Sequence, residues 1–384
     1  MQPELVGFDF TAFLRDTWQR RPQLIRQAWT NWRNPLDPDE LAGLAGEAEV
    51  ESRLVVGGAG DWALEHGPFA AARFGQLGDQ PWTLLVQAVD HHVPEVAALI
   101  APFRFLPNWR IDDVMVSYAS DGGGVGPHFD QYDVFLVQGL GKRRWRIGGQ
   151  CDERSTLLPH DDLRLLNHFE AFDEWVLEPG DVLYLPPGVA HDGVAVGDDC
   201  MTYSIGFRAP SRGELIGLWA DAVLADLDDD DRYADPGIGV QDNPGEISAE
   251  ALAQLQDMIA QKLLDRSSFA RWFGGYASTP KYPEIDWSPD QTVTVPALKA
   301  ALAAGAGLER NPASRFAYIA GESGAVSMFV EGECHDCTGL AATFAKLVCA
   351  ADLVVLDSTL VGDAAVLRLI AQLCNQGSLA IADD

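Results

Sequence analysis

The sequence predicts an α+β chain in which a β-barrel or two-sheet jelly roll is followed by a helical region and a small mixed unit. Short strands punctuated by Gly and Pro fill the stretch from about Ile111 to Phe207, a pattern typical of such barrels. Past Pro210 the apolar residues recur at helical spacing instead. A chain of 384 residues also exceeds the ~100–200 residues of one domain, so we expect several domains.

The residues before the barrel predict a few short elements. Thr11 can cap a first helix carrying Phe13, Leu14 and Trp18, which Pro22 would interrupt. The elements expected next are a strand at 23–26, a loop with a short helix at 35–50, strands at 53–56 and 82–89, and a helix at 91–100. Pro38, Asp39 and Glu40 fit the first turn of that short helix.

Six strands are expected in the barrel region: 114–119, 132–138, 142–147, 174–177, 182–185 and 201–207. A glycine-rich loop at 121–126 follows the first of them. Gly139-Leu140-Gly141 predicts a tight turn, after which the chain returns as the third strand.

Helical spacing dominates the last 175 or so residues. Leu215, Leu218, Trp219 and Val223 lie on one helix face, and Ser248 can cap a second helix. The last block predicts helices at 296–304, 339–349 and 364–372 with a strand pair at 315–319 and 326–330. This combination is typical of a small winged-helix unit.

Charge and composition limit the classes of partner. Lys+Arg 27 against Asp+Glu 57 gives a net charge of −30. Such a field repels phosphates and anionic membranes and attracts basic partners, although it also simply keeps a protein dispersed. No secretory signal opens the sequence, and no apolar run reaches the ~20 residues of a membrane span. The six cysteines are too sparse for a disulfide framework, so we expect a reducing cytoplasm.

One motif predicts a metal centre. His128-Phe129-Asp130 puts an imidazole and a carboxylate on one side of an extended segment, because residues i and i+2 share a face. His191, at the end of a rigid Pro-Gly-rich run that begins at Pro179, can supply a third ligand from another strand. Two histidines and one carboxylate form the facial triad of non-haem iron(II) oxygenases, which leaves positions open for a cosubstrate and dioxygen.

Arg143 is the candidate cosubstrate anchor. In an alternating strand it shares a face with Trp145 and Ile147, and this face is expected to point inward. A buried guanidinium needs a fixed anion. The anion is either an internal carboxylate or the distal carboxylate of 2-oxoglutarate, which suits arginine's planar fork; the adjacent candidate iron site favours the second.

Three further sites have weaker signals. Ser117 is either a core hydroxyl or a second contact to the cosubstrate. Asp121 either caps a turn or accepts a cationic substrate side chain. The lone Cys334-His335-Asp336-Cys337 motif lacks the second cysteine pair that a zinc site requires.

These motifs together resemble a known family. The stretches Val116–Tyr118, Gly122–Phe135 and Arg143–Arg146, with the Pro179–His191 run, are similar to the bacterial ribosomal oxygenases, which are JmjC-type enzymes of the cupin fold. The segment Trp18–Arg26 is similar to the one that opens that domain. The resemblance covers nearly the whole chain and is most specific between Val116 and Arg146.

The resemblance implies a fold, reactants and partners. The fold is a double-stranded β-helix (jelly roll) at 1–209, a helical dimerisation region at 210–290 and a C-terminal winged helix at 291–384. The reactants are iron(II), 2-oxoglutarate and dioxygen, and the reaction is hydroxylation of an arginine Cβ in large-subunit ribosomal protein sixteen. The protein would be a homodimer that binds its basic substrate and does not bind nucleic acid or membrane.

The same resemblance implies a role for each candidate residue. His128, Asp130 and His191 would bind iron, Arg143 and Ser117 would hold 2-oxoglutarate, and Asp121 would meet the substrate guanidinium. Two alternatives stay open: the same chemistry on a histidine of another ribosomal protein or on a small molecule, and a metal-free cupin that only binds a basic partner.

Overall fold

The computed structural model describes residues 5–29, 31–58, 61–160 and 162–382. The chain forms two compact units. The first comprises the residues up to Ala209 together with Asn311–Ala313, and the second comprises Pro210–Arg310 and Ser314–Asp384.

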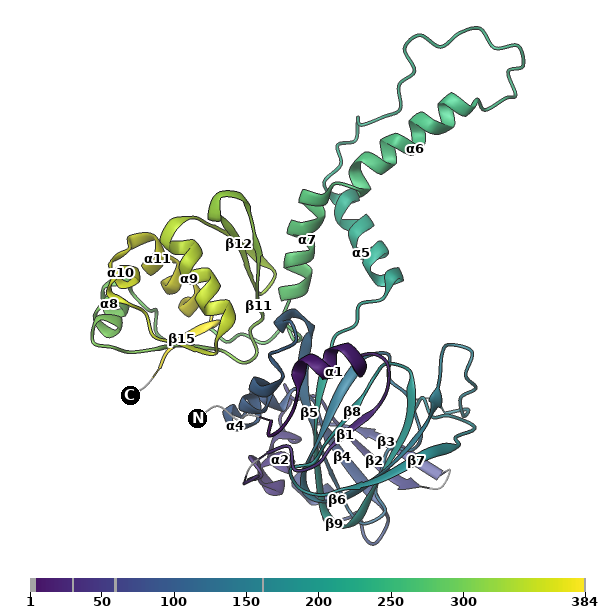
Figure 1. The fold of residues 1–384 in the computed structure, drawn as a ribbon, viewed down its shortest axis with the longest axis vertical. Coiled ribbons are helices and arrows are strands. Elements are labelled where there is room, and N and C mark those ends of the chain that lie inside the picture. The colour runs from purple at the N-terminus through teal and green to yellow at the C-terminus, as the bar shows by residue number, and fades with distance from the viewer. Residues whose placement is uncertain (1–4, 30, 59–60, 161, 383–384) are drawn as a thin grey trace. The chain divides into compact units, whose positions relative to one another are not determined.

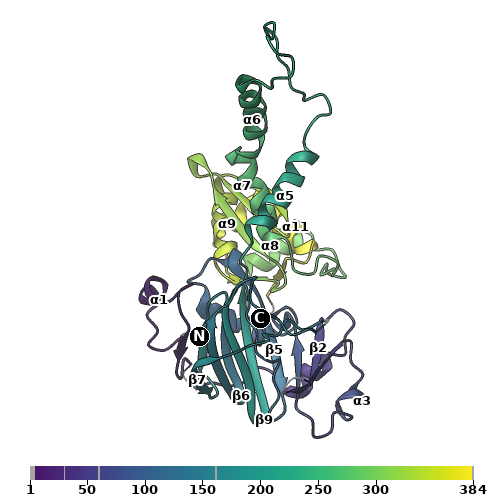
Figure 2. The same cartoon turned by 90° about the vertical axis from the view of Figure 1, so that its right-hand side faces the viewer.

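The first unit is built on one curled antiparallel sheet (Figure 1). Its strands are β1 (Gln23–Ile25), β2 (Ser52–Gly58), β3 (Asp61–His66), β4 (Trp82–Val86), β5 (Ile111–Ala119), β6 (Asp133–Gln150), β7 (Ala171–Leu177), β8 (Val182–Leu185) and β9 (Val189–Phe207). The order is β1-β8-β6-β9-β5-β4-β2-β3, with β7 on the far half of β6. Figure 2 shows the long strands β6 and β9 side by side. The expected barrel is therefore present, although β3 was not predicted.

The prediction of a turn at Gly139–Gly141 was wrong. β6 runs without reversal through these residues and stays paired with β9 on both sides of them. The register shifts at Gln138/Leu140 and at Leu140/Lys142, which marks bulges rather than a hairpin. Gly141 has a φ of +57°, which glycine adopts without strain. The bulges bend β6, so that this one long strand contributes to two parts of the barrel.

Short helices and 3-10 turns accompany the sheet in this unit. They are α1 (Phe10–Asp16), α2 (Pro38–Leu44), α3 (Ala71–Phe74), η1 (Val89–His91), α4 (Pro94–Ala97), η2 (Ala98–Phe103) and η3 (Asn108–Arg110). Asp9, not Thr11, caps α1 through a bond from Ala12 N, whereas α2 has the expected proline start and a capping box between Asp37 and Glu40. Apolar side chains from these elements cover one face of the sheet around Phe135.

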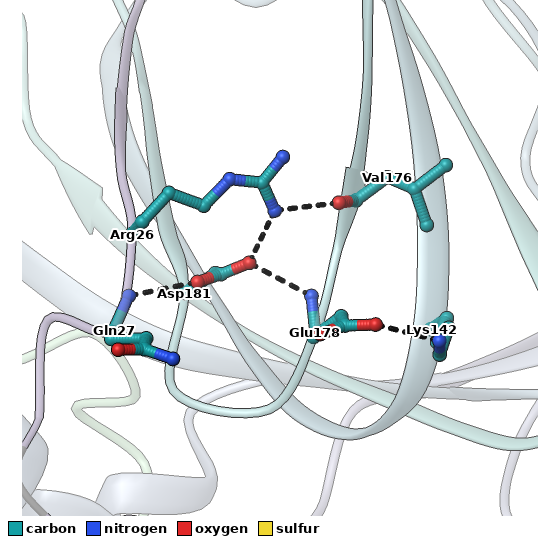
Figure 3. A network of polar contacts seen from close by, with 6 residues as sticks. All are labelled: Arg26, Gln27, Lys142, Val176, Glu178 and Asp181. Atoms are coloured by element: carbon teal, nitrogen blue, oxygen red, sulfur yellow. Dashed lines mark hydrogen bonds and ion pairs between the residues drawn. The ribbon is translucent and has the colours of Figure 1, made fainter.

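A buried carboxylate ties the first strand to the barrel (Figure 3). Asp181, in the turn between β7 and β8, accepts hydrogen bonds from Arg26 Nη1 at 2.6 Å, Gln27 N at 2.8 Å and Glu178 N at 2.9 Å. Lys142 Nζ lies 2.6 Å from Glu178 on the exposed rim. Because Asp181 is almost fully buried, its three donors fix the β7–β8 turn against the end of β1.

The second unit begins with three helices, α5 (Arg212–Ala225), α6 (Ala249–Leu263) and α7 (Arg266–Ser278). Ser211 and Ser248 cap α5 and α6, the latter as predicted, while α7 was not predicted. Ile216, Leu252 and Ile259 expose more than half of their surface, so α5 and α6 present apolar side chains to solvent.

The rest of the second unit surrounds its own core. It contains α8 (Val295–Ala303), α9 (Gly339–Ala350), α10 (Ser358–Gly362) and α11 (Ala364–Asn375), a short 3-10 turn η4 (Glu322–Gly324), and two three-stranded sheets. One sheet consists of β10 (Leu308–Arg310), β14 (Leu353–Val354) and β15 (Leu379–Ile381). The other consists of β11 (Phe316–Ala320), β12 (Val326–Val330) and β13 (Glu333–Cys337). The predicted helices and strand pair of this block are present. In the described part of the chain, no helix has the length and apolar character of a membrane span.

Candidate metal and cosubstrate site

The two candidate histidines meet through their backbones. His128 N donates to His191 O at 3.0 Å, and His191 N donates to His128 O at 2.8 Å. The glycine-rich segment after β5 runs along β9, where Gly124 pairs with Val194 before His128 pairs with His191. The segment forms only isolated bridges with β9, so the expected placement of His128 and Asp130 on one side arises outside a regular strand.

The side chains of His128, Asp130 and His191 converge. One nitrogen from each imidazole and one carboxylate oxygen all lie within 4.8 Å of one another, and this is the one such group of three found among the described residues. His191 Nε2 lies 3.7 Å from Asp130 Oδ2. Ligand atoms this close together are near enough that His128, Asp130 and His191 could hold one metal ion between them. Nitrogen and carboxylate donors of this kind suit iron(II).

Hydrogen bonds fix the tautomer of both rings. His128 Nδ1 lies 2.8 Å from Gly126 O, and His191 Nδ1 lies 2.9 Å from Val189 O. A carbonyl oxygen only accepts, so each ring carries its proton on Nδ1 and keeps the Nε2 lone pair for a metal.

Burial keeps His191 neutral. Its side chain is 4% exposed. Desolvation, and then the neighbouring charge of His128, lower the pKa of His191 to about 4, although Asp130 acts in the opposite direction. A neutral imidazole is the form that binds a metal, so His191 is ready to bind at neutral pH.

Packing also holds the carbonyl that orients His128. Gly126 has a φ of +82°, and a Cβ there would lie 3.0 Å from Trp62 Cζ2 and 3.1 Å from Leu165 Cδ2. Leu166 N donates to Pro127 O at 2.8 Å. The loop between β6 and β7 therefore braces the first metal-ligand candidate from the side.

Arg143 lies where the alternation predicted. Arg143 is 3% exposed. Its register partner on β9 is Ala195. The pairs Trp145–Gly193 and Ile147–His191 follow at two and four residues further along β6. Its Nε and Nη2 are buried and have no hydrogen-bond partner among the described residues, and no ion pair there involves it. The internal salt bridge is therefore not seen, and the guanidinium is free to bind an anion. Four strand residues span about 13 Å along β6 and β9.

Ser117 and Asp121 have different surroundings. Ser117 is buried, and its Oγ lies 3.5 Å from Thr202 O, a long and weak bond. It faces away from the cluster around Phe135, in a row with Thr202 and Gln138. Asp121 is exposed, and its Oδ1 accepts a 2.7 Å bond from Gly197 N, so it braces the adjoining loop. Asp121 Oδ2 has no partner among the described residues.

Three further residues of this region were given no role in the site by the sequence. Trp145 separates Arg143 from His191: its ring centroid lies 5.8 Å from that of His191 and 5.8 Å from Arg143 Cζ. Gly193 faces that indole, and Thr83 buries a hydroxyl without a partner in the described chain. The alternation around Trp145 was visible in the sequence, but the need for glycine opposite it arises only from the register of β6 and β9.

Comparisons with known proteins agree with this geometry. Residues 98–215 match a JmjC domain, and residues 253–380 match the ROXA-like winged helix. Ribosomal protein uL16 3-hydroxylase from Escherichia coli (strain K12) is 43% identical over 292 residues, which cover 74% of this chain and 77% of the relative. The chain belongs to the JmjC-type ribosomal oxygenases. The predicted family, the cupin fold with a winged helix, and the class of 2-oxoglutarate-dependent oxygenase are thereby confirmed.

Solved structures of the family extend the match to the full length. An X-ray structure of E. coli YcfD is 36% identical, with a TM-score of 0.90 and all of both chains covered. A structure of the same ribosomal oxygenase in complex with cobalt and 2-oxoglutarate is 36% identical with a TM-score of 0.88, and covers 99% of this chain and 100% of its own. A probable ribosomal oxygenase from Haemophilus influenzae is 41% identical over 206 residues, which cover 53% of this chain and 50% of the relative.

Proposed function

We propose that this ribosomal oxygenase uses iron(II), 2-oxoglutarate and dioxygen to hydroxylate an arginine Cβ of large-subunit ribosomal protein uL16. The observation that carries the proposal is the convergence of His128, Asp130 and His191 in the same barrel as an unpaired buried arginine. The name of the E. coli relative supports the choice of substrate and of the carbon.

His128, Asp130 and His191 would hold the iron, with both imidazoles offering Nε2. Iron(II) and 2-oxoglutarate, when bound, supply the oxidation of a substrate C–H bond by dioxygen, with succinate and carbon dioxide as by-products. The chain contributes position: the paired backbones of the two histidines and their Nδ1 bonds set the ligand directions before any ion arrives.

Arg143 would bind the distal carboxylate of 2-oxoglutarate, and Ser117 is a weaker candidate for a second contact. The two partnerless nitrogens of Arg143 match a bidentate carboxylate, and binding would remove the cost of a buried unpaired charge. Hydrophobic neighbours exclude water from this part of the barrel; they include Trp145, Ile147, Leu177 and Leu183.

Asp121 would bind the guanidinium of the substrate arginine. Its Oδ2 stays available while Oδ1 holds the backbone of Gly197, so the carboxylate is oriented and still exposed. The net charge of −30 favours approach of a basic ribosomal protein, and no binding of nucleic acid is proposed.

We further propose the division of labour along the chain. Residues 1–209 would be the catalytic domain, 210–290 a helical dimerisation region and 291–384 the winged helix. The exposed apolar residues Ile216, Leu252 and Ile259 support a homodimer, because a second copy would cover them. The enzyme would act in the cytoplasm, where ribosomal proteins are made.

A mass-spectrometric assay tests the proposal. Purified protein with iron(II) and 2-oxoglutarate should add one oxygen to an arginine of uL16 and form succinate. Oxygen added to a histidine of another ribosomal protein would favour the alternative substrate. No oxygen on any basic ribosomal protein and no bound metal in protein purified without air would favour the metal-free binding module.

A further inference from the structure

Trp145 carries a buried hydrogen-bond donor that the fold leaves without a partner. Trp145 is only 6% exposed, and its indole Nε1 has no hydrogen-bond acceptor among the described residues. Buried donors are nearly always paired in native proteins, so such an orphan calls for an explanation.

An orphan donor alone does not define a site. Trp29 Nε1 is also buried without a partner in the described chain, and Trp29 packs on the opposite face of the sheet, in the cluster around Phe135. What distinguishes Trp145 is its position. It lies on β6 two residues from Arg143, and its ring is in contact range of both Arg143 and His191.

The orientation of the indole follows from the strand opposite. A Cβ on Gly193 would lie 2.5 Å from Trp145 Cζ3, 2.6 Å from Cη2 and 2.8 Å from Cε3. The face of the six-membered ring therefore lies over Gly193, and glycine is required there because a Cβ would enter that ring. Nε1 belongs to the five-membered ring, away from the ring atoms that cover Gly193.

Three buried donors without a partner among the described residues thus lie on this face of β6: Arg143 Nε, Arg143 Nη2 and Trp145 Nε1. A fourth, Arg144 Nε, belongs to the residue between them, which alternation places on the opposite face. A carboxylate bound bidentately satisfies the first two. The third lies nearer the histidines, along the same wall. A single dicarboxylate reaching from Arg143 toward the metal ligands would pass beside it.

We propose that the indole N–H of Trp145 donates a hydrogen bond to a carboxylate oxygen of 2-oxoglutarate, as a cosubstrate-binding donor in addition to Arg143. This rests on the proposed function. It assigns Trp145 a polar role beyond that of an apolar wall.

The test replaces Trp145 with phenylalanine, which keeps an aromatic ring and removes the N–H. Trp175→Phe is the matched control, because Trp175 is the register partner of Trp145 on β7 and packs in the same cluster. Binding of 2-oxoglutarate to the cobalt-loaded full-length protein is measured anaerobically by calorimetry, and cobalt binding is measured separately.

Removing a hydrogen bond to a charged group should weaken 2-oxoglutarate binding by W145F about tenfold to a hundredfold. Cobalt affinity should stay unchanged, and W175F should bind as the wild type does. Equal 2-oxoglutarate affinity in W145F, W175F and wild type would overturn the role of Trp145 and leave the proposed function standing. Failure of the wild type itself to bind 2-oxoglutarate would overturn the proposed function, and this inference with it.

A second measurement on the wild type does not depend on how the variant folds. Indole ¹⁵N-labelled protein loaded with zinc gives Nε1–H signals, and the one from Trp145 is identified by its strong broadening when cobalt replaces zinc, because the ring lies 5.8 Å from that of His191. Adding 2-oxoglutarate should move this signal downfield and slow its exchange with water. An unmoved signal at saturating 2-oxoglutarate would refute the hydrogen bond.

Discussion

His128 and His191 exchange both of their backbone hydrogen bonds, at 3.0 and 2.8 Å. The two candidate iron ligands are far apart in sequence, yet their relative position is set by the same interaction that sets strand register. Each ring is then locked by a carbonyl two residues earlier in the chain. The metal-binding geometry is therefore largely a property of the folded backbone, and changes in that backbone should alter metal affinity.

Gly126→Ala should weaken metal binding about tenfold to a hundredfold, because the carbonyl of Gly126 orients His128. The new Cβ would meet Trp62 and Leu165, and the positive φ would cost a further ~1–2 kcal/mol of folding free energy. Cobalt titration followed by absorbance measures the first effect, and denaturant unfolding measures the second.

Gly122→Ala is the control for this variant. Gly122 also has a positive φ, +73°, but its nearest neighbour would be Pro81 Cγ at an ordinary 3.5 Å. It should lose stability and keep its metal affinity. Equal cobalt affinity in both variants would mean that the Gly126 carbonyl does not position His128.

Arg143→Met should change the free energy of unfolding in opposite directions, relative to the wild type, with and without 2-oxoglutarate. The guanidinium is buried and unpaired in the described structure, so removing it should leave the 2-oxoglutarate-free protein as stable as the wild type or more stable. Adding 2-oxoglutarate at 100 times the wild-type dissociation constant to the metal-loaded proteins should stabilise the wild type by about 2.7 kcal/mol and the variant much less. Unfolding curves at both conditions provide the measurement.

The matched control is Arg154→Met, because the Arg154 side chain is 86% exposed and forms its ion pair with the exposed Asp152. It should match the wild type in both conditions. A large loss of stability in Arg143→Met without 2-oxoglutarate would indicate a structural anion partner instead of a cosubstrate site.

His191 should make the metal-free protein sensitive to acid. Its pKa is about 4 in the folded chain and about 6.5 when unfolded, so between these values the unfolded state binds a proton that the folded state does not. The stability from this group is complete above pH 6.5 and is lost as the pH falls toward 4, by up to about 3 kcal/mol. Unfolding free energies of wild type and His191→Asn should therefore converge on acidification; a constant difference from pH 7.5 to 4.5 would exclude this effect.

The sequence predicted which side chains converge better than it predicted the path of the chain between them. His128, Asp130, His191 and Arg143 were identifiable because metal and carboxylate chemistry restricts residue type and spacing. Gly139-Leu140-Gly141 has the same local signature in a hairpin and in a bulged strand, and the pairing with β9 over more than 50 residues of intervening chain decides between them. Local sequence does not contain that information.

The same limit applies to the lining of the site. Trp145 was predicted to point inward, but the requirement for glycine at 193 depends on register. Thr83 lies on β4, which pairs with β5, so its proximity to the barrel interior also follows from tertiary pairing. At the N-terminus, Asp9 and not Thr11 caps the helix. Both residue types can accept the capping hydrogen bond, and the point at which the backbone becomes helical decides which of them does.

Turnover of a basic ribosomal protein should fall as salt rises, because a net charge of −30 attracts it over long range. The effect should appear in kcat/KM and leave kcat nearly constant. Initial rates from about 20 to 300 mM salt measure it, and a short neutral peptide containing the target arginine is the control. Equal salt dependence for both substrates would show that surface charge does not steer the protein.

Asp121→Asn should lower kcat/KM for uL16 about tenfold to a hundredfold, the usual effect of losing a charged hydrogen bond to a guanidinium. Asparagine keeps the oxygen that accepts from Gly197 N, so the loop should keep its fold and the KM for 2-oxoglutarate should not change. Asp152→Asn, at an exposed carboxylate that pairs with Arg154, controls for the loss of one surface charge. If both variants process uL16 as the wild type does, Asp121 serves only to brace the loop, and the substrate guanidinium must find its anion elsewhere in the barrel mouth.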